Sequence, residues 1–234
     1  MIARWLFPIL ALLARPAHTQ GPWGVAYRPL DTTVPRPAIV FLHGMWASPE
    51  DSCNVFARAA TPFGFLVCPR GNAPLEGPEG THWKMWKGTY VDAERQITAA
   101  LDAAQALAPG KLDRAGPGTL IGYSNGAYFA AAVAGAERGR WPGLVLLSMK
   151  LDLDAGRLMA AGVKRVLLAA GDHDESQPSM RALAEQLAAR GLATRFMSLG
   201  PGGHEFPADM PSRMCEAVAW VREADPAECS GSRR

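Results

Sequence analysis

One serine in the chain has the surroundings of a nucleophile. Ser124 stands in the pentapeptide GYSNG at 122–126, after the apolar run 119–121 and before the alanine-rich segment 127–134. This order predicts a strand, a tight turn and a helix, with the serine at the tip of the turn and the backbone N–H groups of the helix N-terminus beside it. A Cβ at either flanking glycine would crowd such a turn. We therefore expect an exposed hydroxyl that can attack an electrophile.

A serine hydroxyl needs a base to become a good nucleophile, and the base needs an acid to orient it. His204 follows a predicted strand at 194–199 and lies in the glycine-rich segment 200–206, a loop that can return an imidazole to the serine. Acidic side chains follow another predicted strand at 166–170, in the sequence GDHDE of residues 171–175. The chain thus offers a nucleophile, an acid and a base, in that order.

Serine, acid and histidine occur in this order in the α/β hydrolases. From about Pro35 to Glu223 the chain resembles that family, through the segments LHG at 42–44, GYSNG at 122–126, GDHD at 171–174 and GH at 203–204. It is most similar to small lidless members, in the carboxylesterase, dienelactone-hydrolase and polyester-depolymerase branches. The resemblance implies the α/β-hydrolase fold, with a mainly parallel central sheet, helices on both faces and no large cap domain.

The resemblance also implies roles for individual residues. The orienting aspartate of the family falls three residues after a glycine, which selects Asp174, with Asp172 as the alternative. The segment 41–46 resembles the strand-His-Gly signature of the family, so the backbone N–H groups of Met45 and Asn125 would bind an oxyanion. The implied catalytic triad is Ser124, Asp174 and His204.

Four other histidines were weighed against His204. His18 falls in the N-terminal leader, His82 lies on a long loop, and His173 stands between two acids. His43 directly precedes the glycine of the implied oxyanion loop. We expect His43 to fix that loop by hydrogen bonding rather than to act as a base.

Strand and helix signals alternate along the chain, which predicts a mainly parallel sheet covered on both faces. Only sixteen residues separate Ser148 from Arg165, too few for a helical lid, so we expect an open site. The predicted strands lie at 38–42, 65–68, 119–122, 144–148, 166–170 and 194–199, with an antiparallel strand at 25–30. The predicted helices lie at 51–60, 91–107, 124–136, 179–190 and 211–223.

Aromatic side chains near these segments are the candidates for a substrate-binding surface. A long loop between Pro69 and Tyr90 carries two tryptophans, and long loops inside a compact domain often carry function. We expect this loop to arch over the serine, while the alternative is that its tryptophans only anchor it. The side chains predicted to contact substrate are Trp46, Trp83, Trp86 and Tyr123.

Residues 1–19 have the layout of a secretory signal peptide, with a positive charge at Arg4 and an apolar run at 6–13 that is too short to span a bilayer. We expect cleavage after Thr19, with Ala17 as the alternative site. Residues 20–234 then form a single domain in the secreted or periplasmic space, without a stable membrane anchor.

Four cysteines follow the leader, and an even number in an exported chain predicts two disulfides. Cys53 lies early in a predicted helix and Cys68 ends the next strand, so both fall on the same rim of the sheet. The tail after the last helix is long enough to fold back, which lets Cys229 reach Cys215. Of three possible pairings we favour these two pairs. No CxxC or paired Cys/His spacing predicts a metal site.

Charge gives no reason to expect nucleic acid or another charged partner. The 24 basic and 22 acidic residues become equal in number once the leader, which holds Arg4 and Arg15, is removed. The sequence therefore predicts a serine esterase that cleaves a small-molecule or polymeric carboxylic ester without a cofactor. A serine peptidase or amidase of the same fold and a non-catalytic binding protein are the alternatives. The acyl chain length and the oligomeric state stay open.

Overall fold

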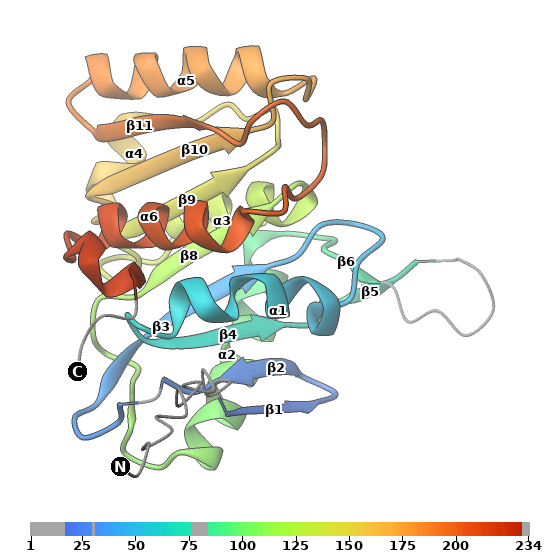
Figure 1. The fold of residues 1–234 in the computed structure, drawn as a ribbon, viewed down its shortest axis with the longest axis vertical. Helices are drawn as coiled ribbons and strands as arrows, with labels where there is room; N and C mark the ends of the chain where they lie inside the picture. Colours follow the sequence, from blue (N-terminus) through green and yellow to red (C-terminus); the bar gives the residue numbers. More distant parts are fainter. Residues whose placement is uncertain (1–16, 30, 76–83, 231–234) are drawn as a thin grey trace, which may run out of the picture.

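The computed structural model describes residues 17–29, 31–75 and 84–230, in which helices cover a central sheet (Figure 1). The strand order is β1-β2-β4-β3-β8-β9-β10-β11, with β7 beside β3. The pairs β1–β2 and β2–β4 are antiparallel, and the other pairs of this sheet are parallel. The strands are β1 (His18–Gly21), β2 (Gly24–Tyr27), β3 (Arg36–Leu42), β4 (Phe65–Pro69), β7 (Leu112–Asp113), β8 (Thr119–Tyr123), β9 (Gly143–Leu147), β10 (Arg165–Ala170) and β11 (Ala193–Ser198). A separate hairpin pairs β5 (Ala73–Pro74) with β6 (Lys84–Met85).

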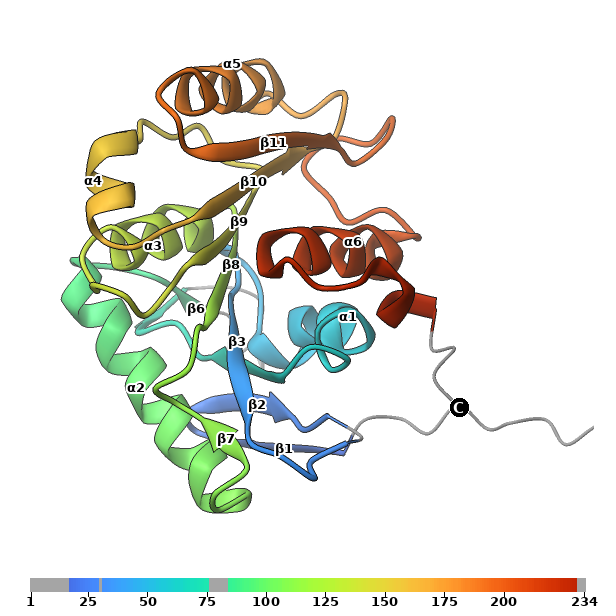
Figure 2. The same ribbon diagram turned by 90° about the vertical axis from the view of Figure 1, so that its left-hand side faces the viewer.

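Helices lie on both faces of the sheet. Figure 2 shows α1 and α6 on one face and α2, α3 and α4 on the other. Helix α5 packs in the same apolar cluster as α2 and α3. The helices are α1 (Pro49–Ala60), α2 (Tyr90–Leu107), α3 (Asn125–Ala134), α4 (Ala155–Ala160), α5 (Gln177–Ala189) and α6 (Met210–Arg222), followed by the 3₁₀ turn η1 (Pro226–Ser230).

Strand β3 shows how the sequence builds two cores. Side chains alternate across a strand, so every second residue faces the same helix layer. Val40 and Leu42 pack with α2 and α3, whereas Ile39 and Phe41 pack with α1 and α6. All four are fully buried. The unbroken apolar run of β3 is therefore what a parallel strand covered on both faces requires.

The predicted elements are confirmed, and the ends of the parallel strands and the helices agree within two residues. The predicted antiparallel strand at 25–30 is present as β2. The elements that the sequence pattern did not predict are β1, the two-residue strands and α4. A two-residue strand has no periodic pattern to detect, and the six residues of α4 make fewer than two helical turns. The predicted absence of a large cap between Ser148 and Arg165 agrees with the short α4 found there.

Strand β1 overlaps the end of the predicted leader. His18 pairs with Tyr27 and Thr19 pairs with Ala26. Cleavage after Thr19 would remove these two residues and half of β1, whereas cleavage after Ala17 would leave the strand whole.

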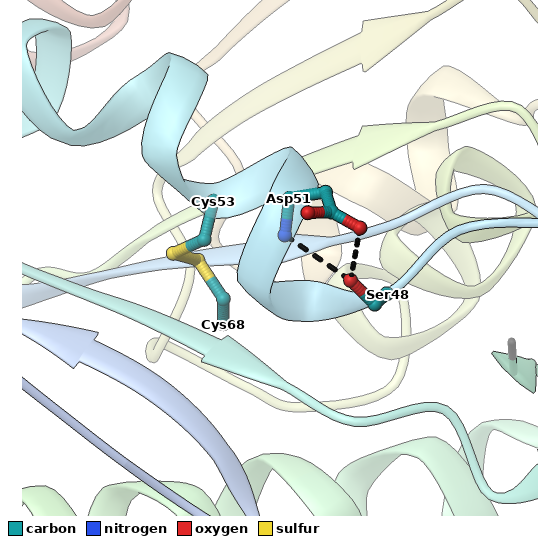
Figure 3. The surroundings of a disulfide bond; sticks show 4 residues. All are labelled: Ser48, Asp51, Cys53 and Cys68. Carbon is teal, nitrogen blue, oxygen red and sulfur yellow. Dashed lines mark hydrogen bonds between the residues drawn. A yellow bond between two sulfur atoms is a disulfide. The ribbon is translucent and has the colours of Figure 1, made fainter. Parts of the chain in front are cut away.

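Both predicted disulfides are present in the structure. Cys53 of α1 bonds to Cys68 of β4, and Cys215 of α6 bonds to Cys229 of η1. Figure 3 shows the first of these bonds close to the start of α1, where the Ser48 hydroxyl accepts a hydrogen bond from the Asp51 N–H at 3.1 Å. The disulfide thus joins the beginning of α1 to the end of β4.

A membrane-spanning helix does not occur among the described residues, since none of their helices has both the length and the hydropathy for it.

We predict that replacing both Cys215 and Cys229 by alanine lowers the free energy of unfolding by about 3 kcal/mol, the chain-entropy value for a loop of about 15 residues. Urea denaturation of the variant beside the oxidised wild type measures the difference. Mass spectrometry of the unreduced wild type, in which no thiol should react with an alkylating agent, is the control. If the free energy of unfolding differs by less than about 1 kcal/mol, this disulfide does not stabilise the fold as predicted.

Candidate active site

Ser124 lies at the turn between β8 and α3, as the sequence predicts. Its φ is +52° and its ψ is −123°, an unusual backbone conformation for a residue with a Cβ. A Cβ on Gly126 would stand 2.1 Å from the carbonyl oxygen of Leu42, so only glycine allows the turn to pack against the end of β3. The strained turn is therefore held by its neighbours, as strained residues at functional sites are.

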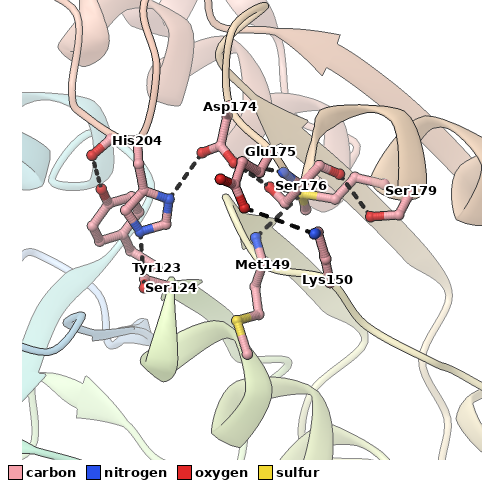
Figure 4. A network of polar contacts seen from close by, with 10 residues as sticks. Tyr123, Ser124, Met149, Lys150, Asp174, Glu175, Ser176, Ser179 and His204 are labelled. Carbon is pink, nitrogen blue, oxygen red and sulfur yellow. Dashed lines mark hydrogen bonds and ion pairs between the residues drawn. The ribbon is translucent and has the colours of Figure 1, made fainter.

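His204 connects Ser124 to Asp174. Its Nε2 lies 3.0 Å from the Ser124 Oγ, and its Nδ1 lies 2.9 Å from the Asp174 Oδ2 (Figure 4). Because a carboxylate only accepts, Nδ1–H donates to Asp174, and Nε2 is left to accept from the serine hydroxyl. The His204 side chain is 51% exposed and that of Asp174 only 2%. The three residues thus form one hydrogen-bonded row that runs from the surface into the interior.

Asp174 is held in place by its own turn. Its Oδ1 accepts hydrogen bonds from the Ser176 N–H at 2.8 Å and from the Ser176 hydroxyl at 2.7 Å. Burial alone would raise the pKa of Asp174, but the hydrogen bonds from Ser176 and His204 outweigh it and bring this pKa below its usual value. The side chain therefore remains a carboxylate, able to stabilise a protonated imidazole.

The neighbouring acids point elsewhere. Asp172 is exposed, and its Oδ1 accepts from the Ser198 hydroxyl at 2.5 Å. Glu175 is 94% exposed and faces the Lys150 ammonium at 3.9 Å. The structure thus places Asp174, and not its alternative Asp172, against the imidazole.

His43 is buried beneath the loop that follows β3. The Gly71 N–H donates to its Nε2 at 3.0 Å, so its proton is on Nδ1, which donates to the Gly44 carbonyl at 2.8 Å. In a trans peptide the C=O and the N–H point in opposite directions. The bond to the Gly44 carbonyl therefore turns the N–H of Met45 away from His43. A Cβ on Gly44 would lie 3.2 Å from that of Ser124, so this loop passes directly beside the serine.

The backbone N–H of Asn125 is the second predicted oxyanion donor. Asn125 is the first residue of α3, where N–H groups have no partner within the helix. Its side chain has a different task, because its Oδ1 accepts from the backbone N–H of Trp86 at 2.7 Å. The start of α3 is thereby tied to the end of the β5–β6 hairpin.

Trp86 lies in the core and not on the predicted substrate surface. Its side chain is 1% exposed, and its indole N–H donates to the His43 carbonyl at 2.9 Å. Its ring packs near those of His43 and Phe129. A ring enclosed in this way cannot contact a ligand, so the anchoring alternative describes Trp86. Trp46 lies in the loop that follows β3, and its side chain is 56% exposed. Trp83 lies outside the described residues.

Tyr123 supports the loop that carries His204. Its hydroxyl donates to the His204 carbonyl at 2.9 Å, and its ring packs against that of Phe206. Burial, with the negative charges of Asp174 and Glu205, raises the pKa of Tyr123 to about 12, so the hydroxyl keeps its proton. Tyr123 is therefore engaged in holding the histidine rather than free to bind a ligand.

Two supporting side chains were not found from the sequence. Ser176 follows Asp174 by two residues, a spacing typical of Asx turns that could have indicated this contact. The side-chain amide of Asn72 donates from Nδ2 to the Lys87 carbonyl and accepts at Oδ1 from the Lys87 N–H, which closes the base of the hairpin. No local pattern marks this pair, because its members lie 15 residues apart. Among the described residues, no three His, Cys, Asp or Glu side chains gather as a metal site would require.

We predict that acid destabilises the fold through His43. Burial, with a smaller contribution from the nearby Arg70 guanidinium, lowers the pKa of His43 from 6.5 to about 4, although the bond to Gly44 and the charge of Glu50 oppose the shift. Between these values the unfolded chain binds the proton and the folded chain does not, so stability falls as the pH falls. The full effect, reached below pH 4, is about 3 kcal/mol.

The measurement is urea denaturation between pH 7.5 and 4, with His43→Asn as the control variant. The variant keeps a donor for the Gly44 carbonyl but cannot titrate. Its free energy of unfolding should vary less steeply with pH than that of the wild type, and equal slopes would contradict the assignment.

No protein-family model matches the chain, and no curated protein matches it either. Solved structures do match. A carboxylesterase from Mesorhizobium loti is 24% identical with a TM-score of 0.58, over 79% of this chain and 88% of that one. An esterase from Pyrobaculum calidifontis is 18% identical with a TM-score of 0.61, over 85% and 80%.

A third structure is that of a fluorophosphonate-binding serine hydrolase from Staphylococcus aureus, which is 15% identical with a TM-score of 0.63 over 89% of this chain and 99% of that one. At these identities the similarity concerns the arrangement of the backbone. With its mainly parallel sheet, its helices on both faces and its short connection between β9 and β10, the chain has the α/β-hydrolase fold.

Proposed function

We propose that the protein is a serine esterase that hydrolyses carboxylic esters through an acyl-enzyme. The observation that carries this proposal is the unbroken row of hydrogen bonds from Ser124 through His204 to Asp174. A structural histidine would not need an exposed ring beside a serine in a strained turn. The esterases among the solved structures of similar fold support the reaction class.

In the proposed reaction each residue of the row has its own step. Ser124 attacks the acyl carbon while His204 Nε2 takes its proton, and the Asp174 carboxylate holds the resulting imidazolium. The N–H groups of Met45 and Asn125 donate hydrogen bonds to the carbonyl oxygen as it becomes negatively charged. A donor of this kind contributes about 3–4 kcal/mol to stabilising the transition state.

The second half of the reaction uses the same groups. His204 gives its proton to the alkoxy oxygen as the ester C–O bond breaks, so that the alcohol leaves and the acyl group remains on Ser124. A water molecule then enters, loses a proton to His204 and attacks the acyl carbon. The bond from this carbon to the Ser124 Oγ breaks, His204 returns the proton to Oγ, and the carboxylic acid leaves. No metal or organic cofactor takes part in the proposed steps.

We further propose that the protein is exported and works in the secreted or periplasmic space. The two disulfides support this location, because such bonds persist in oxidising compartments. Residues 1–16 of the predicted leader at 1–19 lie outside the described residues, and the pairing of β1 makes cleavage after Ala17 the better proposal.

We predict that the reaction requires the Ser124 hydroxyl. Ser124→Ala should lower the kcat for dissolved p-nitrophenyl acetate by about 10⁴-fold or more, because loss of a triad nucleophile leaves only the oxyanion donors and binding. Ser212→Ala, an exposed serine at the start of α6, is the matched control and should leave kcat unchanged. The matching p-nitroanilide should react far more slowly than the ester. Faster cleavage of the anilide would favour the amidase alternative.

The second prediction separates the two aspartates. Asp174→Asn should reduce kcat by about 10⁴-fold, since the amide cannot hold a protonated imidazole. Asp172→Asn should leave kcat within about threefold of the wild type, because its partner is Ser198. An equal or greater loss in Asp172→Asn would reverse the assignment.

A further inference from the structure

Ser148 directly follows β9, and its backbone conformation is unusual. Its φ is +52°, in the left-handed region where a residue with a Cβ is rare. Four non-glycine residues among the described ones have a positive φ, and two of them, Ser124 and Ser148, lie at the ends of the neighbouring parallel strands β8 and β9. Strained residues of this kind persist where the surrounding structure fixes them, and they gather at functional sites.

The Ser148 side chain is buried without a partner. The residue is 1% exposed, and its Oγ is shielded from solvent and forms no hydrogen bond with any described residue. A buried hydroxyl that lacks a hydrogen bond destabilises a fold, so each such group calls for a reason. Glycine at this position would accept the positive φ and would bury no polar atom. Stability alone therefore does not explain a serine here.

Backbone contacts place Ser148 beside the turn that holds Asp174. Strand β9 lies between β8 and β10, and the Ser148 N–H donates to a carbonyl of β10 at 2.9 Å. The next residue, Met149, donates its N–H to the Met180 Sδ at 3.4 Å, and the Ser176 Oγ lies 3.6 Å from the same sulfur. In Figure 4 the backbone nitrogen of Met149 points toward this turn.

The Asp174 carboxylate has room for one more donor. Its two oxygens offer about four acceptor sites. Oδ1 accepts two hydrogen bonds, both from Ser176, whereas Oδ2 accepts one, from His204. The free site is therefore on Oδ2, the oxygen that faces the imidazole.

The Ser148 hydroxyl already stabilises this carboxylate in its charged form. Burial raises the pKa of Asp174, and the hydroxyls of Ser176 and Ser148 are among the groups that bring it below its usual value. During the proposed reaction the carboxylate must hold a protonated His204 in place. Hydrogen bonds at catalytic sites are often poorly aligned in the free enzyme and tighten as the reaction proceeds.

We propose that Ser148 is a positioning residue, whose hydroxyl donates to Oδ2 of Asp174 as His204 becomes protonated and so fixes the carboxylate that orients the imidazole. This inference rests on the proposed esterase function and deepens it. It gives a reason for a strained, buried serine at the end of β9.

The first test removes the hydroxyl in two ways and measures turnover of dissolved p-nitrophenyl acetate. Ser148→Ala and Ser148→Gly should each lower kcat about tenfold and leave KM within about twofold, because the lost bond belongs to the transition state. The urea midpoint of Ser148→Gly should be no lower than that of the wild type, since glycine relieves the positive φ. A kcat within about twofold of the wild type in both variants, or a change in KM alone, would overturn the proposal.

Glu223→Gly is the matched control for the change of backbone. Glu223 has a φ of +56°, and its carboxylate bonds to Arg165 at the amino end of β10, the edge of the sheet opposite to Ser124. Its kcat should stay within about twofold of the wild type, because nothing at the site depends on it. A tenfold fall in this control as well would show that the loss in Ser148→Gly is not specific to the hydroxyl, which would also overturn the proposal.

The second test asks whether Ser148 acts through Asp174. In the Asp174→Asn background, adding Ser148→Ala should lower kcat by less than about twofold further, because the carboxylate that it positions is absent. An equal tenfold fall in both backgrounds would mean that the hydroxyl acts independently of Asp174, and the proposal would be wrong.

The wild type separates the two levels of the argument. If it does not hydrolyse p-nitrophenyl acetate, the esterase function is wrong and this inference falls with it. If it does, and Ser148→Ala is as fast, the esterase function stands and the role of Ser148 alone is wrong.

Discussion

The site depends on the close contact between the turn at Ser124 and the end of β3. Gly126 packs against the Leu42 carbonyl, and Gly44 packs against the Cβ of Ser124, so each segment occupies space that a side chain on the other would need. This contact fixes the distance between Ser124, the proposed nucleophile, and the loop proposed to bind the oxyanion. The positive φ of Ser124 is also held from the other side, because the Ser124 N–H donates to the carbonyl of Leu147 at the end of β9 at 2.8 Å.

A second constraint is the polar network behind the oxyanion loop. His43 receives the Gly71 N–H and donates to the Gly44 carbonyl, and its own carbonyl accepts from Trp86. Trp86 in turn donates its backbone N–H to Asn125. Buried networks of this kind are stable only when every member has a partner, and then they specify one arrangement. Loss of the His43 ring would therefore disturb both predicted oxyanion donors, although it touches neither reacting atom.

The sequence predicted the fold, and it selected the three side chains that lie in one hydrogen-bonded row, because their signals are local. Apolar runs mark buried strands, and glycines at 122 and 126 mark the turn around Ser124. The disulfide pairs were also predicted, from the position of each cysteine relative to the predicted helices and strands. The roles of the aromatic residues were harder to foresee. A tryptophan on a loop can line a pocket or anchor the loop, and only the two acceptors reached by Trp86 decide this. For Tyr123, the deciding partner is a carbonyl 81 residues away.

The central claim is that His204 and Asp174 activate Ser124, and covalent labelling by a fluorophosphonate probe tests it most directly. Such a probe needs an activated serine but no particular acyl group, so the result does not depend on the unknown substrate. We expect rapid labelling of the wild type, much slower labelling of Asp174→Asn and no labelling of Ser124→Ala, with the adduct on the peptide that contains residue 124. Absence of labelling in the wild type, or equal labelling in Ser124→Ala, would contradict the claim.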